Sequence, residues 1–378
     1  MTFTFIHTAD WQIGKAFAQF DADVGAQLRA ARLEAIDRIA GVAGANGAQH
    51  VIVAGDVFDS ELIEDPWLRQ PLARMAAYSD LAWHLLPGNH DPARGGGIWE
   101  RLVRLGLPPN VTPLTMASPY RITPNVVLLP SPLAAKEMRS DPTGWMDHAE
   151  SGAGDLRIGV AHGSVRGFGS LGEAAVPIDA GRRRSAGLDY LALGDWHGTK
   201  KIAAGVWYAG TPEADSFANN DPGHVLVVSI AGQGSEPAVT RVATGCFRWF
   251  ERRAVISRIA DFAPLESEIA MLGANRRHSI LKLVLEGAIG AADAAAIDAR
   301  VAQLAALPLA TLVDQRRLRV LADAADRDRL ADPLLAAVAD RLIARGQHGD
   351  AAEARVAARS MRLLLSLDAG LALRVGAS

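Results

Sequence analysis

Five short motifs rich in Asp, Asn, His and Gln occur within the first 200 residues. They are HTADWQ at 7–12, GDVFD at 55–59, GNHD at 88–91, AHG at 161–163 and GDWHG at 194–198. Their oxygen and imidazole donors suit Mn²⁺, Fe or Zn²⁺. The single cysteine, Cys246, excludes both a thiolate metal cluster and an intramolecular disulfide. The donor set therefore predicts a metal centre built from oxygen and imidazole ligands.

Two adjacent metal ions would suit phosphoester chemistry. Two cations held close together can clamp the oxygens of a phosphodiester and lower the pKa of a bound water. Because the cations repel each other, a carboxylate must be shared between them. The glycine that precedes Asp56 would let this carboxylate approach both ions.

Each motif directly follows a short apolar run that reads as a strand. The predicted strands are 3–7, 50–54, 81–86, 157–161 and 190–193, with an amphipathic helix over 24–43. Strands alternating with helices predict a layered α/β fold with a largely parallel or mixed sheet. In such sheets, sites form at the carboxyl ends of the strands. Turn residues between 206–208 and 225–229 predict a later region rich in antiparallel hairpins.

The character of the chain changes near Thr244 and Gly245. Strands are predicted at 247–258 and 279–285 and a helix at 291–306, followed after Pro333 by one or two amphipathic helices. We therefore expect three parts, at 1–245, 246–325 and 326–378.

Length and composition limit the classes of protein to which the chain can belong. The chain has 378 residues, of which 49% are hydrophobic and 21% charged, so it is not a disordered chain. It has no apolar run of 18 residues and no basic start before an apolar stretch, so we expect a cytoplasmic protein without membrane association. The net charge is −6 over 1–245 and +3 over 246–378, which excludes a globally basic nucleic-acid binder but not a local basic patch.

In this order the motifs resemble those of the calcineurin-like metallophosphoesterases. HTADWQIG, GDVFDS, PGNHDP, LDYLALGDWHG and the YAGTPE at 208–213 resemble the SbcD-type branch, the nuclease subunits that process DNA breaks. The resemblance covers 1–245 and extends weakly into 246–322. It implies a four-layer α/β/β/α sandwich with a small α+β capping domain that helps bind DNA, followed by a C-terminal helical segment.

The resemblance also implies roles for individual residues. A first metal would be held by Asp10, Gln12, Asp56 and His197, and a second by Asp56, Asn89, His162 and Asp195, with Asp56 bridging. His90 would not be a ligand. It would stabilise the transition state or protonate the leaving oxygen, as suits an imidazole.

Two of these positions depart from the commonest pattern of the family. Gln12 stands where a histidine is usual, and Asp195 stands where the first histidine of a GHxH motif is usual. Together with Asp10 and Asp56, Asp195 gives the site three carboxylates. We infer a harder site that favours Mn²⁺ or Mg²⁺ over Zn²⁺. These departures also leave open an inactive subunit.

Several residues beside the motifs allow two interpretations. Asp59, Asp91 and His7 are expected to orient the ligands from behind, although turn-capping carboxylates and a strand-end histidine have the same sequence signature. The tryptophans that adjoin the motifs favour core packing over stacking on an unpaired base. They are Trp11, Trp99 and Trp196.

Basic residues that follow the motifs are candidate contacts for DNA phosphates. They are Arg166, Arg182, Arg183, Arg184, Lys200 and Lys201. For any one of them, a solvated surface charge is the competing interpretation.

The sequence thus predicts a Mn²⁺-dependent DNA phosphodiesterase, an exonuclease with some endonuclease activity that acts in repair or end processing. The alternatives are a phosphoesterase acting on small molecules or nucleotides, and an inactive DNA-binding scaffold. The resemblance implies an SbcC-type ATPase partner bound through the C-terminal region, and a homodimer. An apolar stripe there either packs on the parent domain or docks the partner. It consists of Leu334, Leu335, Val338, Leu342 and Ile343.

Overall fold

The computed structural model describes residues 2–167, 175–321, 327–328, 330 and 332–375. The chain forms two compact units, Met1–Phe247 and Arg248–Ser378. The expected boundary between 325 and 326 lies outside the described residues. The division of the second unit into a capping domain and a helical segment therefore stays a prediction.

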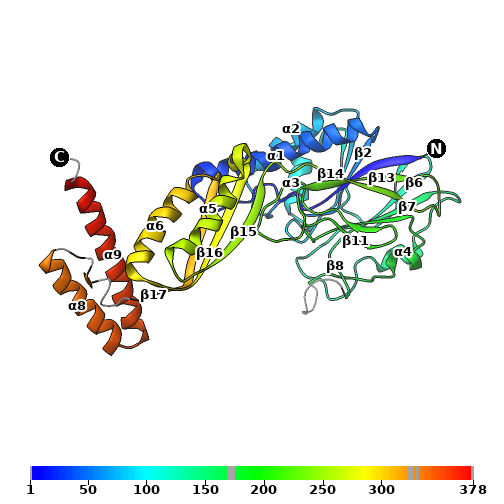
Figure 1. The fold of residues 1–378 in the computed structure, drawn as a ribbon. Coiled ribbons are helices and arrows are strands. Elements are labelled where there is room, and N and C mark those ends of the chain that lie inside the picture. The colour runs from blue at the N-terminus through cyan, green and yellow to red at the C-terminus, as the bar shows by residue number, and fades with distance from the viewer. Residues whose placement is uncertain (1, 168–174, 322–326, 329, 331, 376–378) are drawn as a thin grey trace. The chain divides into compact units, whose positions relative to one another are not determined.

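The first unit contains two six-stranded sheets, and the first of them carries the N-terminus (Figure 1). Its strands are β1 (Phe3–Thr8), β2 (His50–Val53), β3 (Ala82–Leu85), β4 (Val111–Pro113), β13 (His224–Ile230) and β14 (Ala238–Ala243). They lie in the order β14-β13-β1-β2-β3-β4. Strands β1 to β4 are parallel, whereas β13 is antiparallel to both β1 and β14.

The second sheet lies in the order β11-β12-β10-β7-β6-β5. Its strands are β5 (Tyr120–Thr123), β6 (Val126–Ser131), β7 (Leu156–His162), β10 (Tyr190–Gly194), β11 (Lys200–Ala203) and β12 (Val206–Tyr208). The central strands are parallel and the edge strands β5 and β11 are antiparallel. A separate short pair is formed by β8 (Ser164–Val165) and β9 (Pro177–Ile178). The hairpins β11–β12 and β13–β14 confirm the antiparallel region, although β12 and β13 belong to different sheets.

Side-chain alternation along the strands creates the layers of this unit. In β1, Phe5 faces the core between the two sheets, whereas Ile6 faces a core formed with helices. Those helices are α1 (Ala22–Ala45), α2 (Asp65–Ala76) and α3 (Ile98–Leu105). The outer face of the second sheet packs against residues of η1 (Gly144–His148) and residues next to α4 (Arg182–Ser185). The predicted four-layer α/β/β/α sandwich is confirmed.

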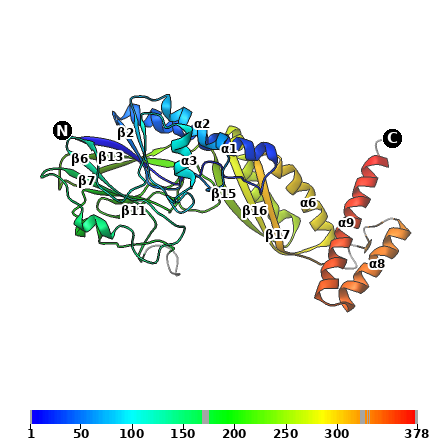
Figure 2. The ribbon, with the colours of Figure 1, turned by 180° about the vertical axis from the view of Figure 1, so that it is seen from behind.

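The second unit is built on a parallel three-stranded sheet (Figure 2). It contains β15 (Arg248–Ile256), β16 (Ser279–Gly290) and β17 (Ala310–Leu321), with α5 (Ala263–Ala270) between the first two strands and α6 (Ala291–Ala305) between the last two. Short 3-10 helices, η2 (Ile259–Phe262) and η3 (Gly273–His278), complete the connections. The helices and the sheet bury an apolar cluster that includes Phe262, Leu283 and Ile297.

Two C-terminal helices follow, α8 (Pro333–His348) and α9 (Ala351–Val375). They pack against each other, and α9 also contacts α6 and β17. Asp332 caps the start of α8 by accepting a hydrogen bond from the backbone N–H of Leu334 at 2.7 Å. Among the described helices, none has the length and apolar character needed to cross a membrane.

Candidate metal centre

The predicted ligands gather where strands of both sheets end. Asp10 follows β1 and Asp56 follows β2 in the first sheet, while His162 ends β7 and Asp195 follows β10 in the second. The backbone of the Asp10 loop is bound to the Asp56 loop, with Asp10 N–H donating to the carbonyl of Gly55 at 3.0 Å. The N–H of Gln12 donates to the carbonyl of Asp56 at 2.9 Å. Backbone pairing therefore fixes the first two ligand loops before any metal is considered.

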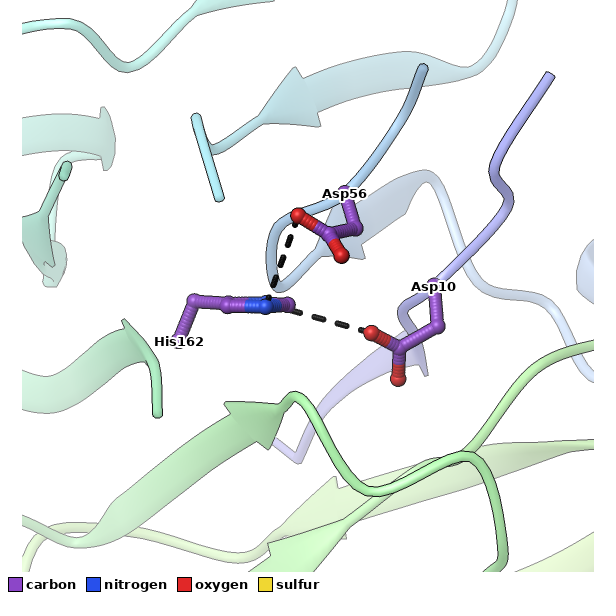
Figure 3. A group of neighbouring side chains, drawn as sticks. All are labelled: Asp10, Asp56 and His162. Carbon is purple, nitrogen blue, oxygen red and sulfur yellow. Dashed lines mark ion pairs between the residues drawn. The ribbon is translucent and has the colours of Figure 1, made fainter. Parts of the chain in front are cut away.

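Asp10, Asp56 and His162 form the centre of the site (Figure 3). One donor atom from each residue lies within 4.8 Å of the other two, and all three side chains are buried. Nε2 of His162 lies 3.5 Å from Oδ1 of Asp56, and Nδ1 lies 3.9 Å from Oδ1 of Asp10. Buried carboxylates this close together need a compensating cation. The donor types and the spacing fit a divalent metal.

The backbone at four predicted ligands is in the left-handed region. The φ angles are 54° at Asp10, 42° at Gln12, 52° at Asp56 and 103° at Asp195. Among the described non-glycine residues only Phe17 and Asp221 share this feature. Such conformations cost free energy and persist only where the surroundings hold them, which is typical of functional sites.

Two motif glycines make room for ligands. A Cβ on Gly55, where φ is +95°, would lie 2.1 Å from Nδ1 of His162. A Cβ on Gly88 would lie 2.1 Å from Oδ1 of Asp56. The sequence predicted that the glycine before Asp56 would let the Asp56 carboxylate approach both ions. The structure shows that Gly55 also makes room for the ring of His162.

His162 is oriented by its neighbours on the side of the predicted second metal. Its Nδ1–H donates to the carbonyl of Ala54 at 2.9 Å, which directs Nε2 towards the side-chain amide of Asn89, also at 2.9 Å. Oδ1 of Asp195 lies 3.9 Å from the same Nε2. Ser164 donates through Oγ to Oδ2 of Asp195 at 2.7 Å. The structure thus brings these three predicted ligands together with Asp56, and adds Ser164 as a support.

Gln12 and His197 meet on the side of the predicted first metal. Their Nε2 atoms are 3.2 Å apart, and Nδ1 of His197 lies 3.2 Å from Oδ1 of Asp215. Lys15 donates through Nζ to Oε1 of Gln12 at 3.1 Å and to Oδ2 of Asp215 at 2.6 Å. The one oxygen that Gln12 could offer a metal therefore accepts a hydrogen bond from an ammonium group.

A buried arginine of α1 holds these loops from behind. Arg32 donates to the carbonyl of Trp11 at 2.7 Å, to that of Asp10 at 3.1 Å and to that of Glu213 at 3.0 Å. Only 3% of its surface is exposed. Arg32, Lys15 and Asp215 were not predicted from the sequence. Lys15 and Asp215 adjoin the HTADWQIG and YAGTPE segments, which is the one signal that could have indicated them.

The GNHD loop places His90 at the open side of the site. The ring Nδ1–H donates to the backbone carbonyl of Asp59 at 2.9 Å, and Nε2 lies 3.9 Å from Oδ2 of Asp56. The side chain is 43% exposed. Asp91 is buried and joins two loops, since its carboxylate accepts from the N–H of Phe58 at 3.0 Å and of Gly88 at 2.7 Å.

His7 lies deeper, in β1. Its Nδ1 is 3.0 Å from the hydroxyl of Tyr190 and its Nε2 is 3.2 Å from the carbonyl of Leu193. Burial lowers the pKa of His7 to about 3, so the ring is neutral. Trp11 and Trp99 are buried in the core, as the packing interpretation predicts.

The electrostatics of the centre reflect its excess of negative charge. Burial raises the pKa of Asp10 to about 6. Burial would lower the pKa of His162, but the charges of Asp56, Asp10 and Asp195 outweigh it and raise that pKa to about 9. Burial also opposes protonation of His197, yet the hydrogen bond with Asp215 raises its pKa overall. Protonation of His162 and His197 thus neutralises part of the negative charge of the carboxylates. A bound divalent cation would neutralise this charge in place of the protons.

The candidate DNA contacts differ in their surroundings. Arg166, Arg184, Lys200 and Lys201 are exposed. Lys201 lies over the ring of Trp207, 5.7 Å from its centroid. Arg183 is half-buried and donates to a backbone carbonyl at 3.2 Å.

The prediction that Arg182 contacts DNA is wrong. It is buried, and it forms ion pairs with Asp141 at 2.8 Å and with Asp147. Because both carboxylates already engage its guanidinium inside the unit, Arg182 is removed from the candidate DNA contacts.

The sequence match that decides the family covers residues 3–229, which is more than half of the chain. The matching family is described as calcineurin-like phosphoesterase. The chain belongs to this family. Members bind two divalent metals, and the membership makes the chain a metal-dependent phosphoester hydrolase.

Similar solved structures include two whose chains are covered almost completely. The protein TT1561 of Thermus thermophilus is 11% identical with a TM-score of 0.42, over 65% of this chain and 100% of that one. A dimetal phosphatase from Danio rerio is 12% identical with a TM-score of 0.35, over 64% and 99%. A purple acid phosphatase from yellow lupin seeds is 13% identical with a TM-score of 0.39, over 65% and 52%. Similarities this low carry no argument about function, and no curated protein matches the chain.

Proposed function

We propose that this calcineurin-like phosphoesterase is a Mn²⁺-dependent DNA phosphodiesterase of the SbcD type, an exonuclease with some endonuclease activity that acts in the cytoplasm. The observation that carries the proposal is the buried cluster of Asp10, Asp56 and His162, with His90 at its open side. The motif resemblance supplies the choice of DNA as substrate. The exposed Arg166, Arg184, Lys200 and Lys201 are proposed phosphate contacts.

The proposed division of labour follows the positions of the side chains. Asp10, Gln12, Asp56 and His197 would hold one ion, and Asp56, Asn89, His162 and Asp195 the other. Bound ions would clamp the phosphate oxygens and lower the pKa of a water. The three carboxylates favour Mn²⁺ or Mg²⁺ over Zn²⁺.

His90 is the proposed proton donor to the leaving oxygen. Its Nδ1–H is already used by the carbonyl of Asp59, so Nε2 is the nitrogen directed to the site. A general acid contributes about 10²- to 10⁴-fold to a rate. We expect His90→Ala to lose that factor in turnover while DNA binding is retained.

Digestion of end-labelled single- and double-stranded DNA tests the proposal. Mn²⁺, Mg²⁺, Zn²⁺ and chelator are compared, with Asp56→Ala and His90→Ala as inactive variants and the exposed His148→Ala as the matched control. Mn²⁺-dependent shortening that is lost in the first two variants and kept in the third supports the nuclease. Cleavage of a simple phosphodiester but not DNA would support the small-molecule enzyme, and inertness towards both would support the scaffold.

A partner ATPase of the SbcC type is proposed to dock on α8. In the predicted apolar stripe, Leu334 and Val338 are 72% and 40% exposed, whereas Leu335, Leu342 and Ile343 pack towards α9. Leu334→Glu with Val338→Glu should abolish co-purification with a co-expressed SbcC-type ATPase, as should deletion of 330–378. Retained binding in both would refute the docking site. Homodimerisation follows only from the resemblance, and light scattering of the purified protein tests it.

A further inference from the structure

Four side chains at the predicted first metal position form a closed ring of contacts. Nζ of Lys15 lies 3.1 Å from Oε1 of Gln12, and Nε2 of Gln12 lies 3.2 Å from Nε2 of His197. Nδ1 of His197 lies 3.2 Å from Oδ1 of Asp215, whose Oδ2 accepts from Lys15 at 2.6 Å. Gln12 and Asp215 are buried. The ring therefore gives both ends of the Gln12 amide a partner inside the protein.

The ammonium group of Lys15 determines how the Gln12 amide is oriented. An ammonium group has three donors and no acceptor, and the nitrogen of a side-chain amide is also only a donor. The amide atom that lies 3.1 Å from Nζ is therefore the oxygen. Turning the amide over would bring two donors together at this distance. Lys15 thus keeps the one metal-binding atom of Gln12 in a hydrogen bond.

A metal ion at the first position would have to compete with Lys15 for this oxygen. The hydrogen bond of a charged group corresponds to about 10- to 100-fold in an equilibrium constant. If the ion and the ammonium group shared the oxygen, the two cations would repel each other. Arg32 adds a second positive charge, since Nη2 lies 3.9 Å from Oδ2 of Asp215. Two cationic side chains therefore flank one carboxylate, which disfavours a further cation.

The amide at the predicted second metal position has different surroundings. One atom of the Asn89 amide lies 2.9 Å from Nε2 of His162 and 3.2 Å from both carboxylate oxygens of Asp56. These neighbours are themselves predicted ligands, so they would bind the ion together with Asn89. Within the described part of the chain, no lysine or arginine forms an ion pair with Asp56 or Asp195. The second position thus offers its ligands without a competing cation.

We propose that Lys15 makes the two metal positions unequal, because it keeps the oxygen of Gln12 away from the first ion. The inference rests on the proposed di-metal phosphodiesterase and deepens it, since it assigns to Lys15 the control of how many ions are bound. The second position binds Mn²⁺ tightly. The first position keeps Asp10, Asp56 and His197 as ligands and binds Mn²⁺ weakly. Lys15 is a positioning residue, because it acts through Gln12.

Binding of Mn²⁺ alone to the metal-free full chain tests this, by titration calorimetry and electron paramagnetic resonance at constant pH. The wild type should bind two ions in two steps of unequal affinity. With one equivalent of Mn²⁺ the spectrum should be that of isolated ions, and the spin-coupled signal of a pair should appear only in excess Mn²⁺. Repulsion between the ions also separates the two steps, so a variant without the ammonium group is decisive.

Lys15→Met should tighten the weaker step by about 10- to 100-fold and leave the tighter step unchanged. The spin-coupled signal should then appear at two equivalents of Mn²⁺. Lys136→Met is the matched control, because it removes one lysine that is exposed and does not belong to the ring. It should leave both steps and the spectrum as in the wild type.

A double-mutant cycle separates the oxygen of Gln12 from the charge of Lys15. Gln12→Leu alone should leave both steps unchanged, because Lys15 already keeps the oxygen from the ion. Combined with Lys15→Met, the same substitution should weaken the tightened step by about 10-fold or more, because the freed oxygen is lost again. An unchanged weaker step in Lys15→Met overturns the inference. Weaker Mn²⁺ binding in Gln12→Leu alone overturns it too, since Gln12 would then be a ligand beside Lys15.

The inference and the proposed function fail in different ways. If the wild type digests DNA while Lys15→Met binds Mn²⁺ as the wild type does, the role of Lys15 fails and the nuclease stands. If Lys15→Met shows the tightened step but neither protein digests DNA, the role of Lys15 stands and the DNA substrate fails. If the wild type binds no Mn²⁺, both fail.

Discussion

Asp215 shows how a residue that is not a ligand can control one. Its carboxylate lies 3.2 Å from Nδ1 of His197 and accepts from Lys15 at 2.6 Å. These contacts hold the pKa of Asp215 well below its usual range despite burial, so the residue is a carboxylate. A carboxylate behind a histidine fixes the tautomer that leaves Nε2 to bind a metal.

We therefore predict that Asp215→Asn weakens Mn²⁺ binding by about 10- to 100-fold, the cost usual for losing such a support. Titration calorimetry with Mn²⁺ alone measures this without relying on turnover. Asp155→Asn is the control, because Asp155 is a buried carboxylate paired with Arg121 and precedes β7, whose far end carries His162. Equal Mn²⁺ affinity in the two variants would show that Asp215 does not act through His197.

Among single residues, those that belong to motifs could be predicted from the sequence, and those outside motifs could not. The Asp10, Asp56 and His162 motifs can be found because each ends an apolar run. Ser164, Arg32 and Asp215 act through partners up to 200 residues away, and no local pattern encodes such a pairing. The structure was needed to find them.

At the scale of the secondary-structure elements, the turn after β3 requires a glycine at position 88, because a side chain there would collide with Asp56. A Cβ at Gly88 would lie 2.1 Å from Oδ1 and 2.4 Å from the backbone nitrogen of Asp56. The backbone atom cannot give way easily, so Asp56 must shift. A misplacement of about 1 Å at a reacting site can cost 10²-fold.

Gly88→Ala should therefore lower phosphodiester turnover by about 10²-fold and should also weaken Mn²⁺ binding. Gly95→Ala, further along the same connection between β3 and α3, is the control, since its added Cβ would meet no atom within 4 Å. Calorimetry and turnover of a chromogenic phosphodiester give the two readouts. Unchanged values for Gly88→Ala would mean that Asp56 tolerates the shift.

Strands β2 and β3 also carry a pair of histidines at some distance from the site. Nδ1 of His50 lies 3.1 Å from Nε2 of His84, and their rings stack with centroids 5.4 Å apart. Tyr120 packs against His84 edge-on. Burial, with a smaller contribution from His50, lowers the pKa of His84 to about 3.

Because the unfolded chain takes up this proton near pH 6.5 and the folded chain does not, acid should destabilise the fold. The free energy of unfolding should fall by about 1.4 kcal/mol per pH unit between about pH 6.5 and pH 3 from His84 alone. His84→Gln should remove about 2 kcal/mol of the loss between about pH 7.5 and 5.0, measured by urea unfolding. The exposed His148→Gln should keep the loss, and an unchanged pH dependence in His84→Gln would show that its ring is protonated in the fold.

The sequence predicted some of the regular elements but missed others, including the apolar strand β6 and the charged strand β17. The run at 50–54 predicts β2, and the periodicity over 24–43 predicts α1. Strand β17 was missed because its segment DQRRLRV is polar and resembles an exposed loop. Pairing with β16 along its length, which no local pattern indicates, makes it a strand.

On the scale of the whole first unit, the predicted ligands connect two sheets. Asp10 and Asp56 belong to loops of the first sheet, and His162 and Asp195 to the second. The sheets otherwise meet through the apolar core that includes Phe5 and Ile158. A cation bound by all four loops would be lost on unfolding, since the unfolded chain does not hold these residues together.

Saturating Mn²⁺ should therefore stabilise this unit by mass action. At a free concentration 100 times the Kd, the gain is about 2.7 kcal/mol. For a unit of this size, 1 kcal/mol raises Tm by about 2–4 °C, so the expected shift relative to EDTA is about 5–10 °C. Tryptophan fluorescence reports it, because seven of the eight tryptophans precede residue 248.

Asp56→Ala tests whether the stabilisation comes from Mn²⁺ bound at the metal centre or from Mn²⁺ bound weakly elsewhere on the surface. Without the carboxylate that faces both Nε2 of His162 and the backbone of His90, the Mn²⁺-dependent shift should disappear. In EDTA this variant should be at least as stable as the wild type, because the substitution relieves repulsion among Asp10, Asp56 and Asp195. Loss of stability in EDTA, or a shift as large as that of the wild type, would mean that Asp56 supports the fold rather than a metal.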